Sequence, residues 1–400
     1  MSVAKVIQTS GFRPTTPKAR EPLWRGPEDP GPQGGVTQSL ISVWLQDRER
    51  ARIKLIEGLQ PPDTFSHRME YGSMVHLAIE RYSGAVKGRD YKDEVGRIRH
   101  ALSGVTEYAQ QLCRRYPTQQ EQVSHWWEVC KVQFPLYVEF WAKHHDDEQR
   151  TPLLQEQTFH VPYQLPSGRT VYLRGKWDGV VAIKKGKESG VWLHETKSKG
   201  DIREGQIQRQ LLWDLQTGLY MTALTESVYN HERYAYDNNG KLKPEWKGPI
   251  LGVRYDVIKR PLSNGKGTIV RHKATKNHPE ETKEHFYGRV RDIINESSSD
   301  YFMRWRVDVR PHDIERFRER CLDPILEMIA WWYDVVALKR DPKEIVREFG
   351  PPPCHFTHPF QAWGNPLLEG GTTEYDEYIT TGNSAGLTEA SELFSELSDA

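Results

Sequence analysis

Residues 173–179 read LRGKWDG, and residues 191–197 read VWLHETK. Both stretches are rich in residues that favour β-strands, and the turn residues between them predict a hairpin. Side chains alternate along a strand, so the apolar face of the second stretch ends in Glu195 and Lys197. Because burial of an unpaired charge is costly, such a strand predicts paired charges or a metal ion.

The predicted hairpin allows Asp178 of the first strand to approach Glu195 of the second. Two adjacent carboxylates repel each other, and a hard divalent cation with oxygen ligands relieves that repulsion. Such a cation can lower the pKa of a bound water, and Lys197 could orient that water or neutralise developing charge. A surface hairpin with solvated charges explains these three residues equally well when they are considered alone.

A helix predicted over residues 203–226 follows the hairpin. Arg209, Trp213, Gln216 and Tyr220 recur there at helical spacing and form one stripe. A stripe of this composition can contact phosphates and stack on bases. An amphipathic helix with a partly buried aromatic edge would give the same pattern.

An earlier helix, predicted over Met69–Tyr82, contains Gly72 and His76 on one stripe beside its apolar face. A lone histidine on a helix is more often a satisfied structural residue than a ligand. A glycine one turn earlier would let another backbone or a ligand approach closely.

In their order along the chain, these motifs resemble those of the RecB-type branch of the PD-(D/E)XK nuclease superfamily, which includes phage-encoded members. That branch has a helix with G…H, then G-x-x-D, then (D/E)-x-K, then Q-x-x-x-Y. The corresponding stretches here are GSMVH at 72–76, GKWD at 175–178, ETK at 195–197 and QTGLY at 216–220. The resemblance covers about residues 40–260.

The resemblance implies a role for each matching residue. Lys197 would serve the attacking water, while Gln216 and Tyr220 would complete the catalytic set and support the nucleic-acid strand, together with Arg209 and Trp213. Glu156 is a lower-ranked candidate for a further acid. The ligands that the resemblance implies for Mg²⁺ or Mn²⁺ are His76, Asp178, Glu195 and the backbone carbonyl of Thr196.

Two features set this chain apart from some members of that branch. Some of them bind an iron–sulfur cluster through one early cysteine and three clustered late ones, whereas Cys354 stands alone late in this sequence. We therefore expect no iron–sulfur cluster. The sequence also lacks G-x-x-x-x-G-K-[ST], so we expect cleavage without ATP, or with the help of a separate motor.

The leading hypothesis is a DNA exonuclease that processes DNA ends in phage recombination, repair or replication, with DNA and a single-strand annealing or recombination protein as partners. A structure-specific or restriction-like endonuclease is the alternative within enzymes. A nucleic-acid-binding module with a catalytically silent nuclease core is the alternative outside them. The polarity, the strand preference and the oligomeric state stay open.

The composition fits a nucleic-acid enzyme only once the charge distribution is considered. The 400 residues have 55 basic and 55 acidic side chains, but residues 369–400 contain eight acids and no Lys or Arg. The rest of the chain therefore has a formal charge of +8. With four scattered cysteines and neither an apolar leader nor a membrane-length apolar run, we expect a cytoplasmic protein, in the host cytoplasm if it is phage-encoded.

The predicted organisation is a flexible Pro/Gly-rich arm (1–36), a nuclease domain with helical additions (37–368) and an acidic disordered tail (369–400). The predicted fold class is mixed α/β, with a central mixed β-sheet flanked by helices and a restriction-endonuclease-like core. Strands are predicted at 155–162, 170–183, 190–197, 250–258 and 301–309. Besides the two helices above, helices are predicted at 37–57, 118–145, 280–297 and 311–338.

Overall fold

The computed structural model of the chain describes most of the sequence between residues 21 and 397. The described residues are 21–60, 63–88, 93–144, 149–184, 189–202, 205, 209, 214–230, 239, 241–246, 248–261, 269–276, 279–337, 388–394 and 397. They fall into two compact units. One takes in the described residues of 21–63, 164–172, 324–337 and 388–397, and the other takes in those of 64–163 and 173–323.

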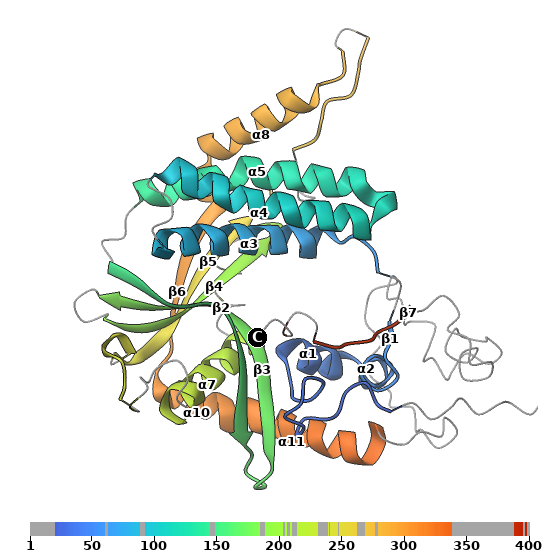
Figure 1. Ribbon diagram of the computed structural model, residues 1–400, viewed down its shortest axis with the longest axis vertical. Helices are drawn as coiled ribbons and strands as arrows, with labels where there is room; N and C mark the ends of the chain where they lie inside the picture. The colour runs from blue at the N-terminus through green and yellow to red at the C-terminus, as the bar shows by residue number, and fades with distance from the viewer. Residues whose placement is uncertain are drawn as a thin grey trace, which may run out of the picture. The chain divides into compact units, whose positions relative to one another are not determined.

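The larger unit is built on a five-stranded sheet, which confirms the predicted mixed α/β fold (Figure 1). Its strands, in spatial order, are β2 (Gln149–Gln164), β3 (Thr170–Lys184), β4 (Gly190–Lys199), β5 (Ile250–Lys259) and β6 (Phe302–Asp308). The β3–β4 and β5–β6 pairs are antiparallel, whereas β4 and β5 run parallel. A parallel pair needs a crossover connection, and α7 (Leu215–Asn230) lies in the one between β4 and β5.

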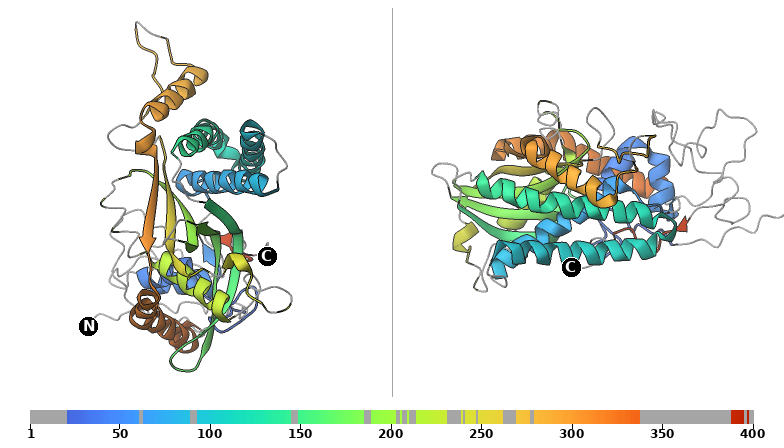
Figure 2. Two further views of the ribbon diagram at one scale, coloured as in Figure 1. Left: turned by 90° about the vertical axis from the view of Figure 1, so that its left-hand side faces the viewer. Right: turned by 90° about the horizontal axis from the view of Figure 1, so that it is seen from above.

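Helices lie on both sides of this sheet (Figures 1 and 2). On one side α3 (His67–Gly88), α4 (Glu94–Arg115) and α5 (Gln120–Lys143) lie together, and on the other α7 packs beside α10 (Pro311–Phe317). Apolar side chains of α3, α4, α5 and α8 (Lys283–Glu296) bury one another in a common core. The shorter elements are η1 (Pro117–Gln119), η3 (Pro244–Trp246), α9 (Ser298–Tyr301) and the π-helical η4 (Arg318–Leu322).

The alternation of side chains along β4 and β5 decides which residues face which helices. Glu195 is paired in register with Tyr255, so both point to the same face. On that face the hydroxyl of Tyr255 contacts the Thr217 hydroxyl of α7. On the opposite face Asp256 accepts a hydrogen bond from Tyr137 of α5. The α7 face of the sheet is therefore where Glu195 lies.

Side-chain caps set several helix boundaries. Asp93 accepts a hydrogen bond from Gly96 N at the start of α4, at 2.6 Å. Asp47 ends one helix and caps the next, so the single helix predicted at 37–57 is two, α1 (Gln38–Gln46) and α2 (Arg48–Leu55). The prediction of one uninterrupted helix was wrong because Asp47 adopts an extended conformation.

The smaller unit contains α1 and α2 with β1 (Leu59–Gln60), α11 (Asp323–Trp332), the π-helical η5 (Tyr333–Ala337) and β7 (Thr388–Glu389). Its ordered start includes Trp24, which is fully buried and donates to the carbonyl of Gly35 at 2.8 Å. Within the predicted acidic tail, β7 pairs with β1, and Phe394 and Leu397 are buried. Residues 21–36 and 388–394 thus form part of the smaller unit, and the rest of the predicted arm and most of the rest of the predicted tail lie outside the described residues.

None of the helices in the described part of the chain combines the length and the apolar composition needed to cross a bilayer.

Candidate active site

The β3–β4 hairpin brings the two predicted acids together. Gly179 pairs with His194 in antiparallel register, which places the preceding Asp178 beside the end of β4. One carboxylate oxygen of Asp178 accepts a hydrogen bond from the backbone N–H of Thr196 at 2.7 Å. The predicted hairpin and the predicted approach of the two acids are both confirmed.

Glu195 is a fully buried carboxylate. Its Oε2 accepts a hydrogen bond from Lys197 Nζ at 3.2 Å, whereas its Oε1 has no hydrogen-bond partner among the described residues. Burial, and then the negative charge of Asp178, raise the pKa of Glu195 to about 8. A buried acceptor that lacks a donor is costly, so this oxygen is suited to a cation.

A second group of ligand atoms lies next to Glu195. His76 of α3, Glu156 of β2 and Asp178 of β3 each offer one atom, and these atoms lie within 4.8 Å of one another. His76 Nδ1 is 3.5 Å from Asp178 Oδ2 and 3.9 Å from Glu156 Oε1. Burial lowers the pKa of His76, but the carboxylates of Asp178 and Glu156 outweigh it and raise the net value. Without a metal, a protonated His76 can therefore supply the positive charge between these acids.

Glu156 reaches this group because the backbone of β2 departs from regular strand geometry. Its φ of +45° lies in the left-handed region, which residues other than glycine seldom adopt. Its Oε2 pairs with Lys176 Nζ at 2.8 Å. Burial raises the pKa of Glu156, but its contacts with His76 and Lys176 lower it overall. Alternation along a strand gives no sign of this irregularity, so the sequence alone did not show that Glu156 joins the group.

The chemistry of these donors fits a hard divalent cation. Two carboxylates and one imidazole converge, and one oxygen of the neighbouring Glu195 is buried without a donor among the described residues. Oxygen-rich sets of this kind suit Mg²⁺ or Mn²⁺. Thr196 lies between Glu195 and Lys197 with its N–H committed to Asp178.

Lys197 is held in place by two side chains. Its Nζ donates to Gln216 Oε1 at 2.6 Å as well as to Glu195, and Gln216 Nε2 lies 3.4 Å from Glu195 Oε2. Burial lowers the pKa of Lys197, but Glu195 and Asp214 outweigh it and raise the net value. A lysine kept protonated in this way can donate a hydrogen bond or neutralise charge, but it cannot accept a proton at neutral pH.

Tyr220 packs inside the protein, which argues against the predicted contact between its ring and nucleic acid. The residue is 9% exposed, and its ring lies edge-to-face on Phe159 with centroids 5.3 Å apart. A Cβ added to Gly175 would come within 2.6 Å of Phe159 and 3.0 Å of Tyr220, so the glycine of the G-x-x-D motif makes room for both rings. Its buried ring is placed for support of the site.

The other members of the predicted stripe are less informative. Arg209 is exposed, and its Nε donates to the carbonyl of Gly205 at 3.0 Å. Trp213 lies outside the described residues. A Cβ on Gly72 would meet Ser198 at an ordinary 3.9 Å, so the close approach expected at that glycine is not tight enough to require it.

Comparison with known families agrees with this geometry. The sequence model described as the PD-(D/E)XK nuclease superfamily matches residues 46–306. The chain belongs to the PD-(D/E)XK nuclease superfamily. No match was found among curated proteins. The matched range contains all the acids described above and both strands of the hairpin, so this PD-(D/E)XK protein is a metal-dependent nuclease with DNA as its implied substrate.

Proposed function

We propose that this nuclease is a DNA exonuclease that processes DNA ends during phage recombination, repair or replication. The observation that supports it best is the buried Glu195 beside Asp178 in a chain whose motif order resembles the RecB-type branch. An Mg²⁺ or Mn²⁺ ion, without an iron–sulfur cluster or ATP, completes the proposed site. A single-strand annealing or recombination protein is the proposed partner, in the cytoplasm.

Each residue in the proposed site has a distinct task. The proposed ligands of the ion are His76, Glu156, Asp178, Glu195 and the carbonyl of Thr196, and when bound the ion supplies Lewis-acid stabilisation of the phosphodiester. Lys197 donates to the attacking water or the phosphate and balances developing negative charge. Gln216 fixes both Lys197 and Glu195 through its amide. Tyr220 packs beneath the hairpin and keeps it in place.

The proposed end-directed activity is tested with linear and covalently closed circular DNA of the same sequence in Mn²⁺. We expect degradation of the linear form and none of the circle. Cleavage of both forms would favour the endonuclease alternative, and cleavage of neither would favour the silent binding module. Strands labelled at one end or the other then give the polarity.

Glu156→Gln is expected to weaken Mn²⁺ binding by about tenfold to a hundredfold, because it removes one charged ligand and leaves the pocket shape unchanged. Isothermal titration with Mn²⁺ measures this directly. The matched control is Glu80→Gln, because Glu80 interacts electrostatically with Glu156 but is not one of the three clustered residues. Equal Mn²⁺ affinity in Glu156→Gln and the wild type would remove Glu156 from the ligand set.

Gln216→Ala is expected to lower the turnover number by about tenfold to a hundredfold with little change in Mn²⁺ affinity. The amide does not belong to the clustered ligands but fixes Lys197 at 2.6 Å. Tyr220→Phe should have a smaller effect in the same direction, because the ring that packs on Phe159 is kept. A large loss of Mn²⁺ affinity in Gln216→Ala would instead place the amide's main role at the ion.

A further inference from the structure

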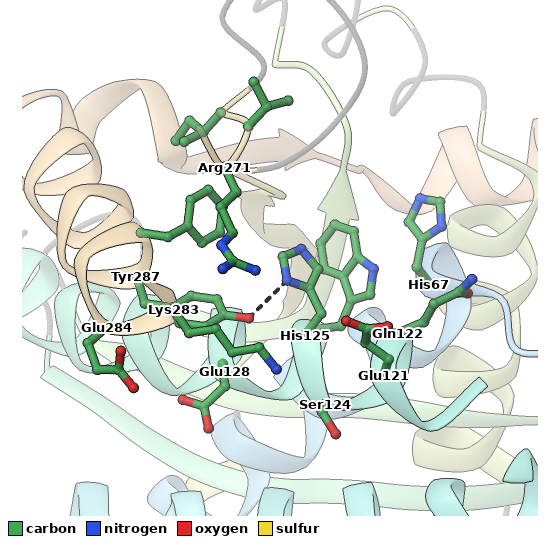
Figure 3. A pocket seen from close by; sticks show the side chains of 14 residues that line it. His67, Glu121, Gln122, Ser124, His125, Glu128, Arg271, Lys283, Glu284 and Tyr287 are labelled. Atoms are coloured by element: carbon green, nitrogen blue, oxygen red, sulfur yellow. Dashed lines mark hydrogen bonds between the residues drawn. The ribbon is translucent and has the colours of Figure 1, made fainter. Parts of the chain in front are cut away.

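A pocket of about 920 Å³ lies between α5, α8 and the segment at residues 269–271 (Figure 3). Its walls combine aromatic rings with cationic side chains, the two features that non-specific single-strand sites share. The lining residues used below are His67, His125, Trp126, Arg271, Lys283 and Tyr287.

The rings of this pocket are fixed in place by one another. The exposed His67 ring stacks on Trp126 with centroids 5.0 Å apart and an interplanar angle of 8°. His125 Nδ1 forms a 2.9 Å hydrogen bond with the hydroxyl of Tyr287, which holds both rings at the wall (Figure 3). Burial, followed by the charge of Lys283, lowers the pKa of His125, so near neutral pH this ring is an uncharged aromatic surface.

Cations and carboxylates both line this pocket. Arg271 forms an ion pair with Glu280, which lies shortly before the start of α8, with 3.2 Å between the guanidinium nitrogen and the carboxylate oxygen. Among the described residues, Lys283 forms no ion pair. Of the three carboxylates in the wall, Glu128 is paired with Lys131 at 2.8 Å. Lys283 is therefore the cation best placed to receive a phosphate.

A basic cluster connects His67 with the cleavage site. Arg68 follows His67 at the start of α3, Lys199 ends β4, and Arg260 follows β5 and donates its N–H to the carbonyl of Lys199 at 2.8 Å. After burial, the charges of Arg260 and Arg68 lower the pKa of His67, and those of Lys197 and Arg260 lower that of Lys199. Like charges gathered this closely repel one another, and a bound anion would relieve that repulsion.

We propose that one strand of the substrate runs from the cleavage site across Arg68, Lys199 and Arg260, which hold a backbone phosphate, into the pocket between α5 and α8. There its nucleotides stack on the aromatic side chains of the pocket wall, beginning at His67. Lys283 contacts a backbone phosphate. The ligand is a stretch of single-stranded nucleic acid several nucleotides from the scissile bond. This inference rests on the proposed DNA nuclease function and adds to it the path of the strand.

The path is tested by measuring the affinity for single-stranded DNA as a function of length, in the Glu195→Gln background so that no cleavage occurs. Oligonucleotides from about 4 to about 16 nucleotides cover the usual range of single-strand sites. In the parent, affinity should rise with length until the pocket is filled. His67→Ala should weaken binding about tenfold, only for oligonucleotides long enough to reach the pocket. His67→Phe keeps the ring and should restore most of the affinity.

The basic cluster of Arg68, Lys199 and Arg260 is tested through the salt dependence of DNA binding. Arg68→Ala should lower the slope of log affinity against log salt by about one, as expected when one phosphate contact is lost. Lys143→Ala is the matched control, because Lys143 is exposed on the last turn of α5, pairs with Glu139 and lies outside the pocket. It should bind DNA of every length as the parent does.

Two results would overturn the path. An equal loss in His67→Ala at every length would place His67 at the cleavage site, and no loss at any length would exclude the pocket from DNA binding. In either case cleavage of linear DNA by the wild type would leave the proposed nuclease function intact. A wild-type protein that neither binds nor cuts DNA would instead overturn that function and this inference with it.

Discussion

Asp178→Asn is expected to reduce DNA cleavage by at least about a hundredfold while the fold is kept. Asp178 offers a ligand atom within 4.8 Å of those of His76 and Glu156, so its loss removes negative charge from the centre of the proposed ion site. The asparagine oxygen can still accept the hydrogen bond from Thr196 N, which now spans 2.7 Å. The hairpin should therefore remain closed although the ion binds weakly.

The measurements are cleavage of end-labelled linear DNA in Mn²⁺ and titration of Mn²⁺ against the metal-free protein. Asp201→Asn is the matched control, because Asp201 lies two residues after the end of β4, is about half exposed and has a distant ion pair with Lys259 at 3.9 Å. It should cut DNA as the wild type does. Full activity in Asp178→Asn, with native circular dichroism, would contradict the central assignment of the site.

The parts of this site that could be predicted from the sequence are those that follow a regular period. Alternation on β4 places Glu195 and Lys197 on one face, and the turn residues after β3 predict the hairpin that brings Asp178 to them. Helical spacing likewise places Gln216 one turn before Tyr220 on α7. Local geometry alone fixes these relations, so one sequence is enough to derive them.

Other features depend on irregular backbone or on tertiary packing. Glu156 joins the cluster through a φ of +45°, which no alternation rule anticipates. Tyr220 lies on the stripe predicted to contact DNA, but Phe159, from a strand about sixty residues earlier, covers its ring. The helix α4 was not predicted, although Ala101, Val105, Ala109 and Leu112 recur at helical spacing on its buried face.

Buried residues near the two ends of the chain also could not be predicted from the sequence. Residues 21–36 have no hydrophobic period, but Trp24 is buried and Val36 N donates to Tyr172 O at 2.7 Å within the smaller unit. Phe394 and Leu397 are buried in the same unit. Contacts between segments this far apart in sequence leave no local signal, so composition alone could not predict these buried residues.

The metal-free protein is expected to lose stability as the pH rises from about 4.5 to 8, and Glu195→Gln should abolish most of that loss. Burial, followed by the charge of Asp178, raises the pKa of Glu195 to about 8 in the folded state, from an ordinary value of 4.5. Between these values the folded state keeps a proton that the unfolded state has released. The free energy of unfolding therefore falls by about 1.4 kcal/mol for each pH unit in this window.

Loss of the proton from His76 also lowers the stability of the metal-free protein, in the upper part of this pH range. Its pKa is raised in the folded state, so the stability that its protonated form contributes is complete below its unfolded pKa and disappears as the pH rises through the folded value. Glu156 has a lowered pKa, so its contribution is present above its unfolded value and is lost only in acid. The net expectation for the wild type is a loss of roughly a few kcal/mol by about pH 8.

Thermal unfolding in a chelator, from about pH 5 to about pH 9, measures this loss. At the acid end wild type and Glu195→Gln should have similar stability, because the wild-type carboxyl is then protonated and resembles the amide. At the alkaline end the variant should be the more stable protein by a few kcal/mol. Adding Mn²⁺ at about pH 8 should restore the wild type and have little effect on the variant, since the ion binds the deprotonated carboxylate. Parallel pH curves for the two proteins would show that Glu195 is ionised in the metal-free fold and would contradict the buried, ion-dependent carboxylate on which the proposed site is built.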